Sequence, residues 1–252
     1  MNYNIKTITS PANPLIRHVV TLHAAKHRAE SQQFIAEGFR TISTIIKAGN
    51  TPLNLFVIED FLYDAQQLVK DSNIIIITPE VMRKISTAQS PSGLLATFAI
   101  PQQPALDTLN AGLVLAQITD PGNMGTLIRT AAAMNKKTIV CINTVDPWNP
   151  KVVQATAGAI SLVSIFRMNW NDLIRNKKNI PLCALVASQG QAPHTINLSN
   201  ALIVVGSESH GIPEEWINEC DAKITLPMPG NFESLNAAVA GSIALYLAAT
   251  GN

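Results

Sequence analysis

Charged residues, cysteines and aromatic residues are all scarce in this 252-residue sequence. Charged side chains make up 14% of it and hydrophobic residues 47%, whereas a typical soluble domain is about 25% charged. The three cysteines, Cys141, Cys183 and Cys220, form no CxxC pair and no cluster with histidine, so neither a zinc motif nor a disulfide framework is expected. Such sparse cysteine use is typical of a reducing cytoplasm.

Long apolar runs and nucleotide-binding glycine motifs are missing as well. No uninterrupted apolar stretch reaches about 18 residues, so no membrane span is expected. The opening residues MNYNIKTITSPANP lack the apolar segment of a signal peptide, and we expect a cytoplasmic protein. The sequence has no GxxxxGK[ST], GxGxxG or GxSxG, which argues against a P-loop NTPase, a dinucleotide-dependent oxidoreductase and an α/β-hydrolase.

The near-neutral net charge of +1 conceals a basic N-terminal stretch. Residues 1–47 hold six basic side chains against two acidic ones, Glu30 and Glu37, and three of the five histidines. A local excess of this kind can follow a phosphate backbone, but it is equally typical of an ordinary solvated helix face. The basic residues are Lys6, Arg17, Lys26, Arg28, Arg40 and Lys47.

Short apolar runs alternate with helical patterns through most of the chain. The runs are rich in Val, Ile and Leu without polar alternation, as in strands covered on both faces. The expected strands are 53–58, 74–77, 94–99, 113–118, 138–142, 182–186 and 202–205, and the expected helices are 38–48, 124–135, 213–218 and 235–249. This alternation predicts an α/β fold with mainly parallel sheets.

A domain boundary is expected at IPQQPALDTLN, residues 100–110, where two prolines and several polar residues interrupt the pattern. The predicted division is an N-terminal domain of residues 1–100, a linker of residues 101–110 and a C-terminal domain of residues 111–252. No internal repeat is visible.

The segment DPGNMGTLIR, residues 120–129, directly follows a predicted strand. A strand that runs through Pro-Gly-Asn into a helix leaves free backbone N–H groups at the helix start. Asn123 and Arg129 are expected to reach one mouth at the carboxyl ends of the strands, where α/β sheets bind ligands. The plainer interpretation makes Asn123 a cap and Arg129 an exposed helix residue.

Two later segments also have residues that suggest a functional role and not only a structural one. GSESHG, residues 206–211, follows a buried strand, and its glycines permit close approach to a ligand. Glu208 either positions a polar ligand or caps the next helix. In ITLPMPGNFESLNAAVA, residues 224–240, Ser234 is a candidate helix N-cap before a helix rich in small residues.

In this order, the three segments resemble the signature motifs of the SpoU (TrmH) family of RNA 2′-O-ribose methyltransferases, a branch of the SPOUT superfamily. DPGNMGTLIRTAAAMN is similar to the first motif, LIVVGSESHGI to the second and ITLPMPGNFESLNAAVAGSIALY to the third. ITSPANPLIRHVVTLHAAKHR, FIAEGFRTISTIIKAG and STAQSPSGLLATFAIP are similar to the family's L30e-like substrate-binding domain. The likeness covers nearly the whole chain.

The resemblance implies a C-terminal α/β domain with a parallel sheet threaded into a trefoil knot, preceded by a smaller L30e-like α/β domain. It also implies a homodimer whose active site is completed near the subunit interface, with S-adenosylmethionine bound in bent form by the knot loops. The implied cofactor-binding residues are Gly206, Ser207, Leu226, Met228, Leu235 and Asn236. The implied catalytic residues are Asn123, Arg129, Glu208, Ser234 and Asn236.

The implied reaction is methyl transfer from S-adenosylmethionine to a ribose 2′-hydroxyl of structured RNA, with ribosomal RNA of the 23S type favoured over transfer RNA. Because a guanidinium with a pKa above about 12 is a poor base, Arg129 is expected to bind the ribose or its phosphate. The alternatives are a transfer RNA 2′-O-methyltransferase and a non-catalytic knotted RNA-binding protein.

The N-terminal domain is expected to contact RNA through Arg17, Lys26, Arg28 and Arg40, while Phe34 and Phe39 are expected in its core. The sequence departs from the family pattern twice. Ser209 and His210 follow Glu208 where glycine is frequent, and Gln154 stands where arginine is common.

Overall fold

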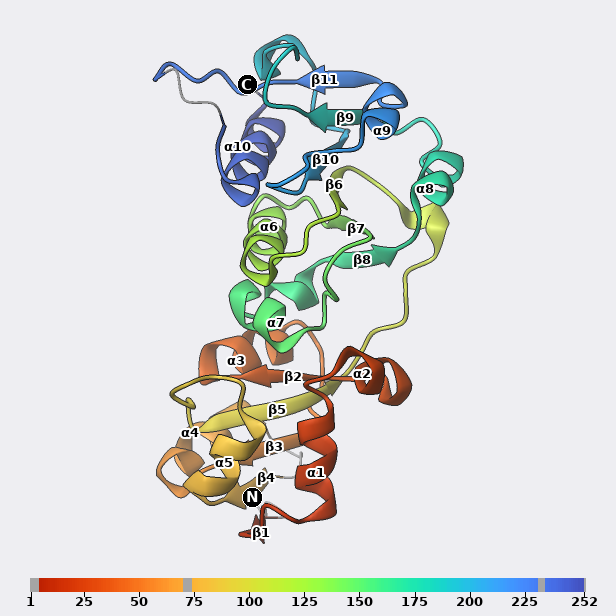
Figure 1. The fold of residues 1–252 in the computed structure, drawn as a ribbon. Coiled ribbons are helices and arrows are strands. Elements are labelled where there is room, and N and C mark those ends of the chain that lie inside the picture. The colour runs from red at the N-terminus through yellow and green to blue at the C-terminus, as the bar shows by residue number, and fades with distance from the viewer. Residues whose placement is uncertain (1–4, 70–73, 231–233, 252) are drawn as a thin grey trace. The chain divides into compact units, whose positions relative to one another are not determined.

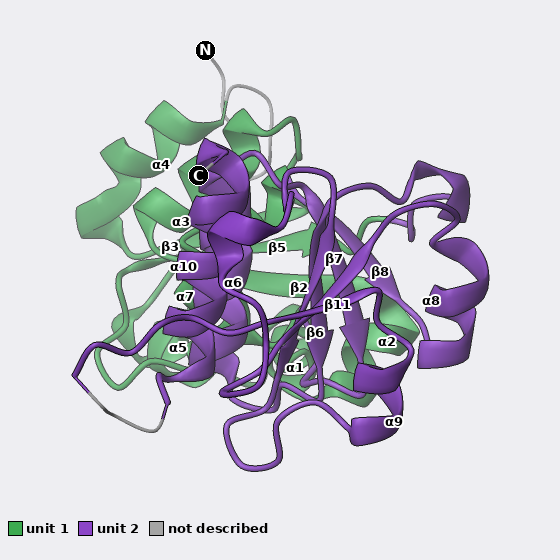
Figure 2. Cartoon of the chain, turned by 90° about the horizontal axis from the view of Figure 1, so that it is seen from above, with its two compact units in different colours: residues 1–101, 148–162 green, residues 102–147, 163–252 purple. Residues whose placement is uncertain are grey.

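The computed structural model describes residues 5–69, 74–230 and 234–251. The chain forms two compact units, coloured separately in Figure 2. Unit 1 comprises residues 1–101 and 148–162, and unit 2 comprises residues 102–147 and 163–252. The chain therefore leaves unit 2 and returns to it, an excursion that the sequence patterns did not indicate.

Unit 1 contains a five-stranded mixed sheet with the order β1-β4-β3-β5-β2 (Figure 1). The pairs β1–β4 and β3–β4 are parallel, whereas β3–β5 and β2–β5 are antiparallel. Its strands are β1 (Lys6–Ile8), β2 (Gln33–Glu37), β3 (Asn54–Val57), β4 (Ile74–Ile77) and β5 (Leu94–Ala99). Its helices are α1 (Pro14–Thr21), α2 (Ala25–Ser31), α3 (Phe39–Lys47), α4 (Leu62–Leu68), α5 (Pro79–Ile85) and α7 (Pro150–Thr156), with short 3-10 turns η1 (Glu59–Phe61) and η3 (Ala159–Leu162).

The excursion 148–162 packs against β2 and α3 inside unit 1. The ring of Trp148 lies 4.8 Å from that of Phe34, which also stacks on Phe98 at 5.6 Å. Gly158 has a φ of +88°, and a Cβ built there would lie 2.6 Å from the backbone oxygen of Thr41. Only glycine therefore suits this approach to α3.

Unit 2 contains a six-stranded sheet, parallel in every pair, with the order β11-β9-β10-β6-β7-β8. The strands are β6 (Gly112–Ala116), β7 (Thr138–Ile142), β8 (Ser164–Arg167), β9 (Leu182–Leu185), β10 (Leu202–Gly206) and β11 (Ala222–Ile224). The helices are α6 (Pro121–Ala133), α8 (Trp170–Asn176), α9 (Glu214–Asn218) and α10 (Ala237–Thr250), with 3-10 turns η2 (Leu106–Thr108) and η4 (Pro193–Thr195). Central residues such as Val114, Val140 and Val204 are completely buried, as expected of strands covered on both faces.

All seven predicted strands are present as β3, β4, β5, β6, β7, β9 and β10, and the four predicted helices as α3, α6, α9 and α10. The α/β class is confirmed. The expectation of mainly parallel sheets is correct for unit 2 and wrong for half of the unit 1 strand pairs, since β5 runs antiparallel to both its neighbours. The described residues contain no helix long and apolar enough to span a membrane.

Two expectations for unit 1 are wrong. Phe39 is 45% exposed rather than in the core. Arg28 is buried at 1% exposure, and its Nη1 donates to the carbonyls of Leu22 at 2.8 Å and His23 at 2.9 Å. Arg28 therefore ties the turn between α1 and α2 and does not offer its guanidinium to an RNA. Arg17, Lys26 and Arg40 are exposed, and Lys26 lies 3.9 Å from Glu30.

Candidate active site

The polar residues of the first two motif segments are brought together by strand pairing. Strands β6 and β10 are neighbours and run parallel, with Ala116 opposite Gly206 at their carboxyl ends. The turn after β6 leads to Asn123 and the turn after β10 leads to Glu208. Because parallel strands end at one edge of the sheet, both side chains lie there, at the kind of crevice where α/β sheets bind ligands.

The starts of α6 and α10 are fixed by side-chain caps. The carboxylate of Asp120 accepts a hydrogen bond from the backbone N–H of Asn123 at 2.8 Å, and Pro121 occupies the first turn. At α10, the Oδ1 of Asn236 accepts from the N–H groups of Ala238 and Val239. The helix cap is thus Asn236, and the expectation that Ser234 serves as the N-cap is wrong.

Asn123, Glu208 and Asn236 form one hydrogen-bonded group, which we call the Asn–Glu–Asn cluster. The Nδ2 of Asn236 donates to Glu208 Oε1 at 2.7 Å and to Asn123 Oδ1 at 3.2 Å. The Nδ2 of Asn123 also donates to Glu208 Oε1. Capping by Oδ1 orients the Asn236 amide, so that its Nδ2 faces the carboxylate. One residue from each motif segment therefore meets at a single carboxylate.

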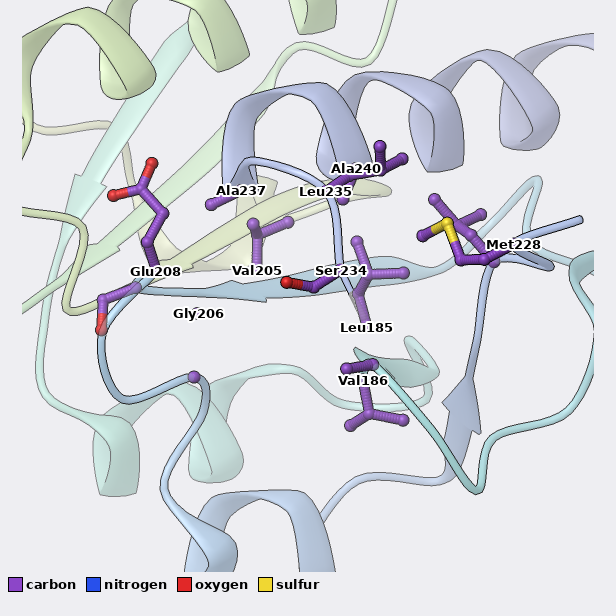
Figure 3. A pocket seen from close by; sticks show the side chains of 14 residues that line it. Leu185, Val186, Val205, Gly206, Glu208, Met228, Ser234, Leu235, Ala237 and Ala240 are labelled. Carbon is purple, nitrogen blue, oxygen red and sulfur yellow. The ribbon is translucent and has the colours of Figure 1, made fainter. Parts of the chain in front are cut away.

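A cavity of about 280 Å³ opens beside this cluster, at the ends of β9, β10 and β11 (Figure 3). It extends from Glu208 at one end to Met228 at the other. Five of the six expected cofactor-binding residues line it: Gly206, Ser207, Leu226, Met228 and Leu235. Ser234 and Glu208, expected to be catalytic, line it as well. Asn236, expected in both roles, is not among the lining residues and reaches the cavity through Glu208.

Several lining residues were not anticipated from the sequence, namely Leu185, Val186, Ala187, Val205, Gly211, Ala237 and Ala240. The first three lie at the end of β9 and just after it, and β9 lies between β10 and β11. The available signal was the carboxyl end of an adjacent buried strand, but strand order is needed to use it.

The lining fits the cofactor that the resemblance implies. Leu185, Val186 and Leu226 give apolar walls, which suit a flat heterocycle. Glu208 places a carboxylate at one end, where it would attract a cationic sulfonium. S-Adenosylmethionine combines these two features, an adenine ring and a positively charged sulfur.

The loop after β10 is closed tightly upon itself. The N–H of Gly211 donates to the carbonyl of Ser207 at 2.8 Å. A Cβ built on Gly206 would lie 2.2 Å from the backbone carbon of Gly211. Any larger residue at position 206 would therefore force open the loop that carries Glu208. The departures Ser209 and His210 are exposed on this loop and bond to each other at 2.7 Å.

Arg129 lies apart from the cavity within this chain. It is exposed on α6, does not line the cavity, and has no hydrogen-bond or ion-pair partner among residues 5–69, 74–230 and 234–251. Six residues separate it from Asn123, which on an α-helix is about 9 Å along the axis and roughly 120° around it. The structure therefore brings Asn123 to Glu208 and Asn236 but does not bring Arg129 there.

The three cysteines are not part of the site. Burial raises the pKa of the Cys141 thiol to about 12, that of Cys183 to about 11 and that of Cys220 to about 12. Thiols of this kind are protonated near neutral pH and are weak nucleophiles and ligands. The described part of the chain contains no group of three side chains suited to hold a metal ion.

Comparisons with known proteins agree with this geometry. Residues 110–246 match the SpoU rRNA Methylase family, and residues 13–96 match an MRM3-like substrate binding domain. The chain is 24% identical to the 23S rRNA guanosine 2′-O-methyltransferase RlmP of Bacillus subtilis, over 96% of this chain and 98% of the relative. It is 29% identical to a tRNA/rRNA methyltransferase of Synechocystis, over 96% of this chain and 93% of the relative.

A solved structure shares the whole fold. The rRNA methyltransferase of Sinorhizobium meliloti, crystallised with S-adenosylmethionine bound, is 26% identical and superposes with a TM-score of 0.86 over 98% of both chains. The family match covers more than half of the sequence, including all three segments that form the Asn–Glu–Asn cluster and its cavity. The chain belongs to the SpoU family of RNA methyltransferases, which use S-adenosylmethionine.

Proposed function

We propose that this protein methylates a ribose 2′-oxygen of ribosomal RNA, and that it works as a homodimer. The observation that carries the proposal is the meeting of Asn123, Glu208 and Asn236 beside the cavity at the ends of β9, β10 and β11. Support for the 2′-oxygen of ribosomal RNA comes from the relative RlmP, whose name gives that target.

When bound, S-adenosylmethionine supplies an electrophilic methyl group. The task of the protein is then mostly positioning, with the reacting atoms held about 3–3.5 Å apart in line. Asn123 and Asn236 hold the carboxylate of Glu208 in place through their amide N–H groups. Glu208 in turn orients a donor on the ligand or the ribose. The exposed hydroxyl of Ser234 lies on the cavity wall, within reach of a polar ligand atom.

Arg129 is proposed to act on the ribose or its adjacent phosphate in the partner's site. Its exposed position on α6 leaves the guanidinium free to cross an interface. A group that stays protonated throughout cannot accept the proton of the 2′-hydroxyl, so Arg129 binds and orients while a phosphate oxygen or water takes the proton.

The proposed interface is an apolar stripe, which we define as Leu235, just before α10, and Val239, Ile243 and Tyr246 on α10. These side chains are 37%, 46%, 39% and 55% exposed. The buried face of α10 around Gly241 packs against α6 and β10, and at the border of this face the hydroxyls of Ser242 and Thr130 lie 2.9 Å apart. Exposed large apolar side chains at helical spacing mark a surface for association. Arg129 is next to Thr130, so the stripe and the arginine belong to one helix pair.

The reaction is tested with purified protein, tritiated S-adenosylmethionine and total RNA, containing both ribosomal and transfer RNA, from a strain lacking the gene. The expected product is tritiated RNA with a single new site resistant to alkaline hydrolysis, because a 2′-O-methyl group blocks cleavage of the following phosphodiester. Label in a base would contradict the ribose assignment, and label only in transfer RNA would contradict the choice of RNA.

The dimeric site is tested by mixing two inactive variants, Arg129→Ala and Glu208→Gln. If Arg129 serves the partner's cavity, a mixed dimer contains one intact site, and an equal mixture recovers about a quarter of wild-type activity. A mixture as inactive as its parts would place both residues in the same subunit's site. Sedimentation of an Ile243→Glu, Tyr246→Glu variant checks the interface, with a monomer expected.

A second candidate is an RNA-binding protein without turnover, in which the cavity no longer binds the cofactor. Calorimetry decides between the two, since absence of heat at millimolar S-adenosylmethionine would favour this candidate. The intact polar cluster favours the enzyme.

A further inference from the structure

Unit 1 has a cavity of its own, of about 290 Å³. It lies between the end of β2, the segment after α5 and helix α7, all of which belong to unit 1. We call it the Glu37 pocket, lined by Ile35, Glu37, Thr87, Ala88, Pro150, Lys151, Gln154 and Ala155. This volume is close to the 280 Å³ of the cavity beside the Asn–Glu–Asn cluster, and it is large enough for a single nucleobase.

Glu37 supplies a buried carboxylate to this pocket, with 8% of the residue exposed. Its Oε1 accepts from the Ser86 hydroxyl at 2.9 Å and from the backbone N–H of Ser92 at 3.1 Å. Among the described residues, its Oε2 accepts only from the same Ser86 hydroxyl, at 2.8 Å, and the Ser92 hydroxyl lies 3.5 Å from Oε1. No lysine, arginine or histidine pairs with it among the described residues.

This arrangement leaves acceptor capacity on one oxygen. A carboxylate has about four lone-pair sites, while a hydroxyl has one hydrogen to donate. Since Ser86 shares that hydrogen between the two oxygens, Oε2 is the under-satisfied one. A buried charge without a cation is costly unless donors surround it. The pocket therefore favours a ligand that brings N–H donors to Oε2.

The remaining walls match the other parts of a nucleotide. Ile35, Ala88, Pro150 and Ala155 form apolar surface on which a base can lie. Lys151 is exposed at the rim and provides a cation for a phosphate. Gln154 is also exposed there, its side chain makes no hydrogen bond within the described residues, and its amide can both donate and accept.

We propose that the Glu37 pocket holds one unpaired nucleotide of the RNA substrate and prefers a base with an exocyclic amino group, guanine above all. Guanine presents an N1–H and an N2–H side by side, which matches a carboxylate acceptor. Uracil presents a single N–H between two carbonyls, which the carboxylate repels. Sequence-specific RNA recognition commonly uses splayed-out bases read along their Watson–Crick edges. The inference rests on the proposed function because it takes the ligand to be RNA.

The test measures binding of the full chain to fluorescein-labelled pentanucleotides UUGUU and UUUUU by fluorescence anisotropy, without S-adenosylmethionine. The expected result is binding of UUGUU about tenfold tighter than UUUUU. Glu37→Gln is expected to reduce that ratio below about twofold, since the amide keeps the shape but presents donors of its own. Equal affinities of the wild-type protein for the two, or no binding of either, would overturn the proposal.

Two further variants separate recognition from folding. Ser86→Ala removes a hydrogen bond from Glu37 but keeps its carboxylate, so the preference for UUGUU should persist. Ala155→Leu fills the pocket without touching Glu37 and should remove the preference. Melting temperatures show whether each variant is folded. A folded Glu37→Gln or Ala155→Leu variant that retains the full preference would contradict the assignment.

Two added arms distinguish the alternatives. Unlabelled GMP that competes as strongly as UUGUU would identify a free nucleotide as the ligand and overturn the RNA subsite. Methyl transfer to ribosomal RNA is measured on the same preparations. A preference for UUGUU without methyl transfer would contradict the proposed reaction but support the nucleotide subsite. Methyl transfer without the preference would contradict only the subsite.

Discussion

The six-stranded sheet of unit 2 is parallel throughout, whereas the five-stranded sheet of unit 1 mixes parallel and antiparallel pairs. In unit 2, parallel strands deliver three polar loops to one edge, and Asn123, Glu208 and Asn236 meet there. In unit 1, the most buried charged residues, Arg28 and Glu37, are bonded to their own unit's backbone and hydroxyls. Parallel topology brings side chains from distant segments to one edge of the sheet, while in unit 1 Arg28 and Glu37 lie at separate places and bond to different groups.

The largest effect is expected from Arg129→Ala in unit 2. Removing a group that binds the reacting ribose should lower turnover by about 10²-fold or more. Because Arg129 does not line the cavity, the affinity for S-adenosylmethionine should stay within a few-fold. Single-turnover kinetics and calorimetry give the two values. Near-normal turnover would remove the residue from the site.

Gly206→Ala should have the next largest effect, because it distorts the loop after β10. The new Cβ would overlap the Gly211 backbone, so the loop must shift, and S-adenosylmethionine affinity should fall about tenfold. Gly211→Ala is the matched control, because its Cβ meets nothing within 4 Å and only its φ of +67° is unfavourable, at about 1–2 kcal/mol. Equal losses in the two variants would exclude the overlap as the cause.

In unit 1, Arg28→Met should lower the free energy of unfolding by about 2–4 kcal/mol, since a buried and a part-buried carbonyl lose their charged donor. Arg17→Met changes an exposed side chain of the same unit and should stay within about 0.5 kcal/mol. Urea unfolding of both variants provides the measurement. A stable Arg28→Met protein would show that the buried guanidinium is dispensable.

A smaller effect is expected for the exposed arginines of unit 1. Replacing Arg17 and Arg40 together by alanine should weaken ribosomal RNA binding and reduce its salt dependence. The log–log slope should fall by about 0.7–0.9 for each phosphate that the variant no longer neutralises. Filter binding across a salt series measures the slope. An unchanged slope would place the RNA footprint elsewhere.

The smallest change should come from alkylating reagents. With thiol pKa values raised to about 11–12 by burial, the thiolate fraction at pH 8 is far below that of a free cysteine. Native protein should therefore react with iodoacetamide much more slowly than urea-unfolded protein. Rapid labelling of Cys141, which is buried on β7 next to the edge strand β8, would mean that this sheet opens.

The sequence predicted the strands of unit 2 well because continuous apolar runs such as 202–205 are distinctive of buried parallel strands. It missed β2, whose QFIAE mixes polar and apolar residues, and the short strands β1, β8 and β11. Arg28 shows the limit of charge patterns, since in a sequence a guanidinium that bonds two carbonyls looks the same as one on the surface. The Asn–Glu–Asn cluster was anticipated through the motifs, but the separation of Arg129 from it required the helix geometry.

The return of residues 148–162 to unit 1 has a consequence for dissecting the molecule. Because Trp148 packs on Phe34, and Gly158 on Thr41 and Thr44, a gene fragment ending at residue 101 would lack part of its own interior. After a single protease cut between residues 101 and 110, residues 148–162 of the C-terminal piece would still be packed in unit 1, so the two pieces would stay associated. One boundary near residue 101 therefore does not separate the two units. Separation would need three cuts, after residues 101, 147 and 162.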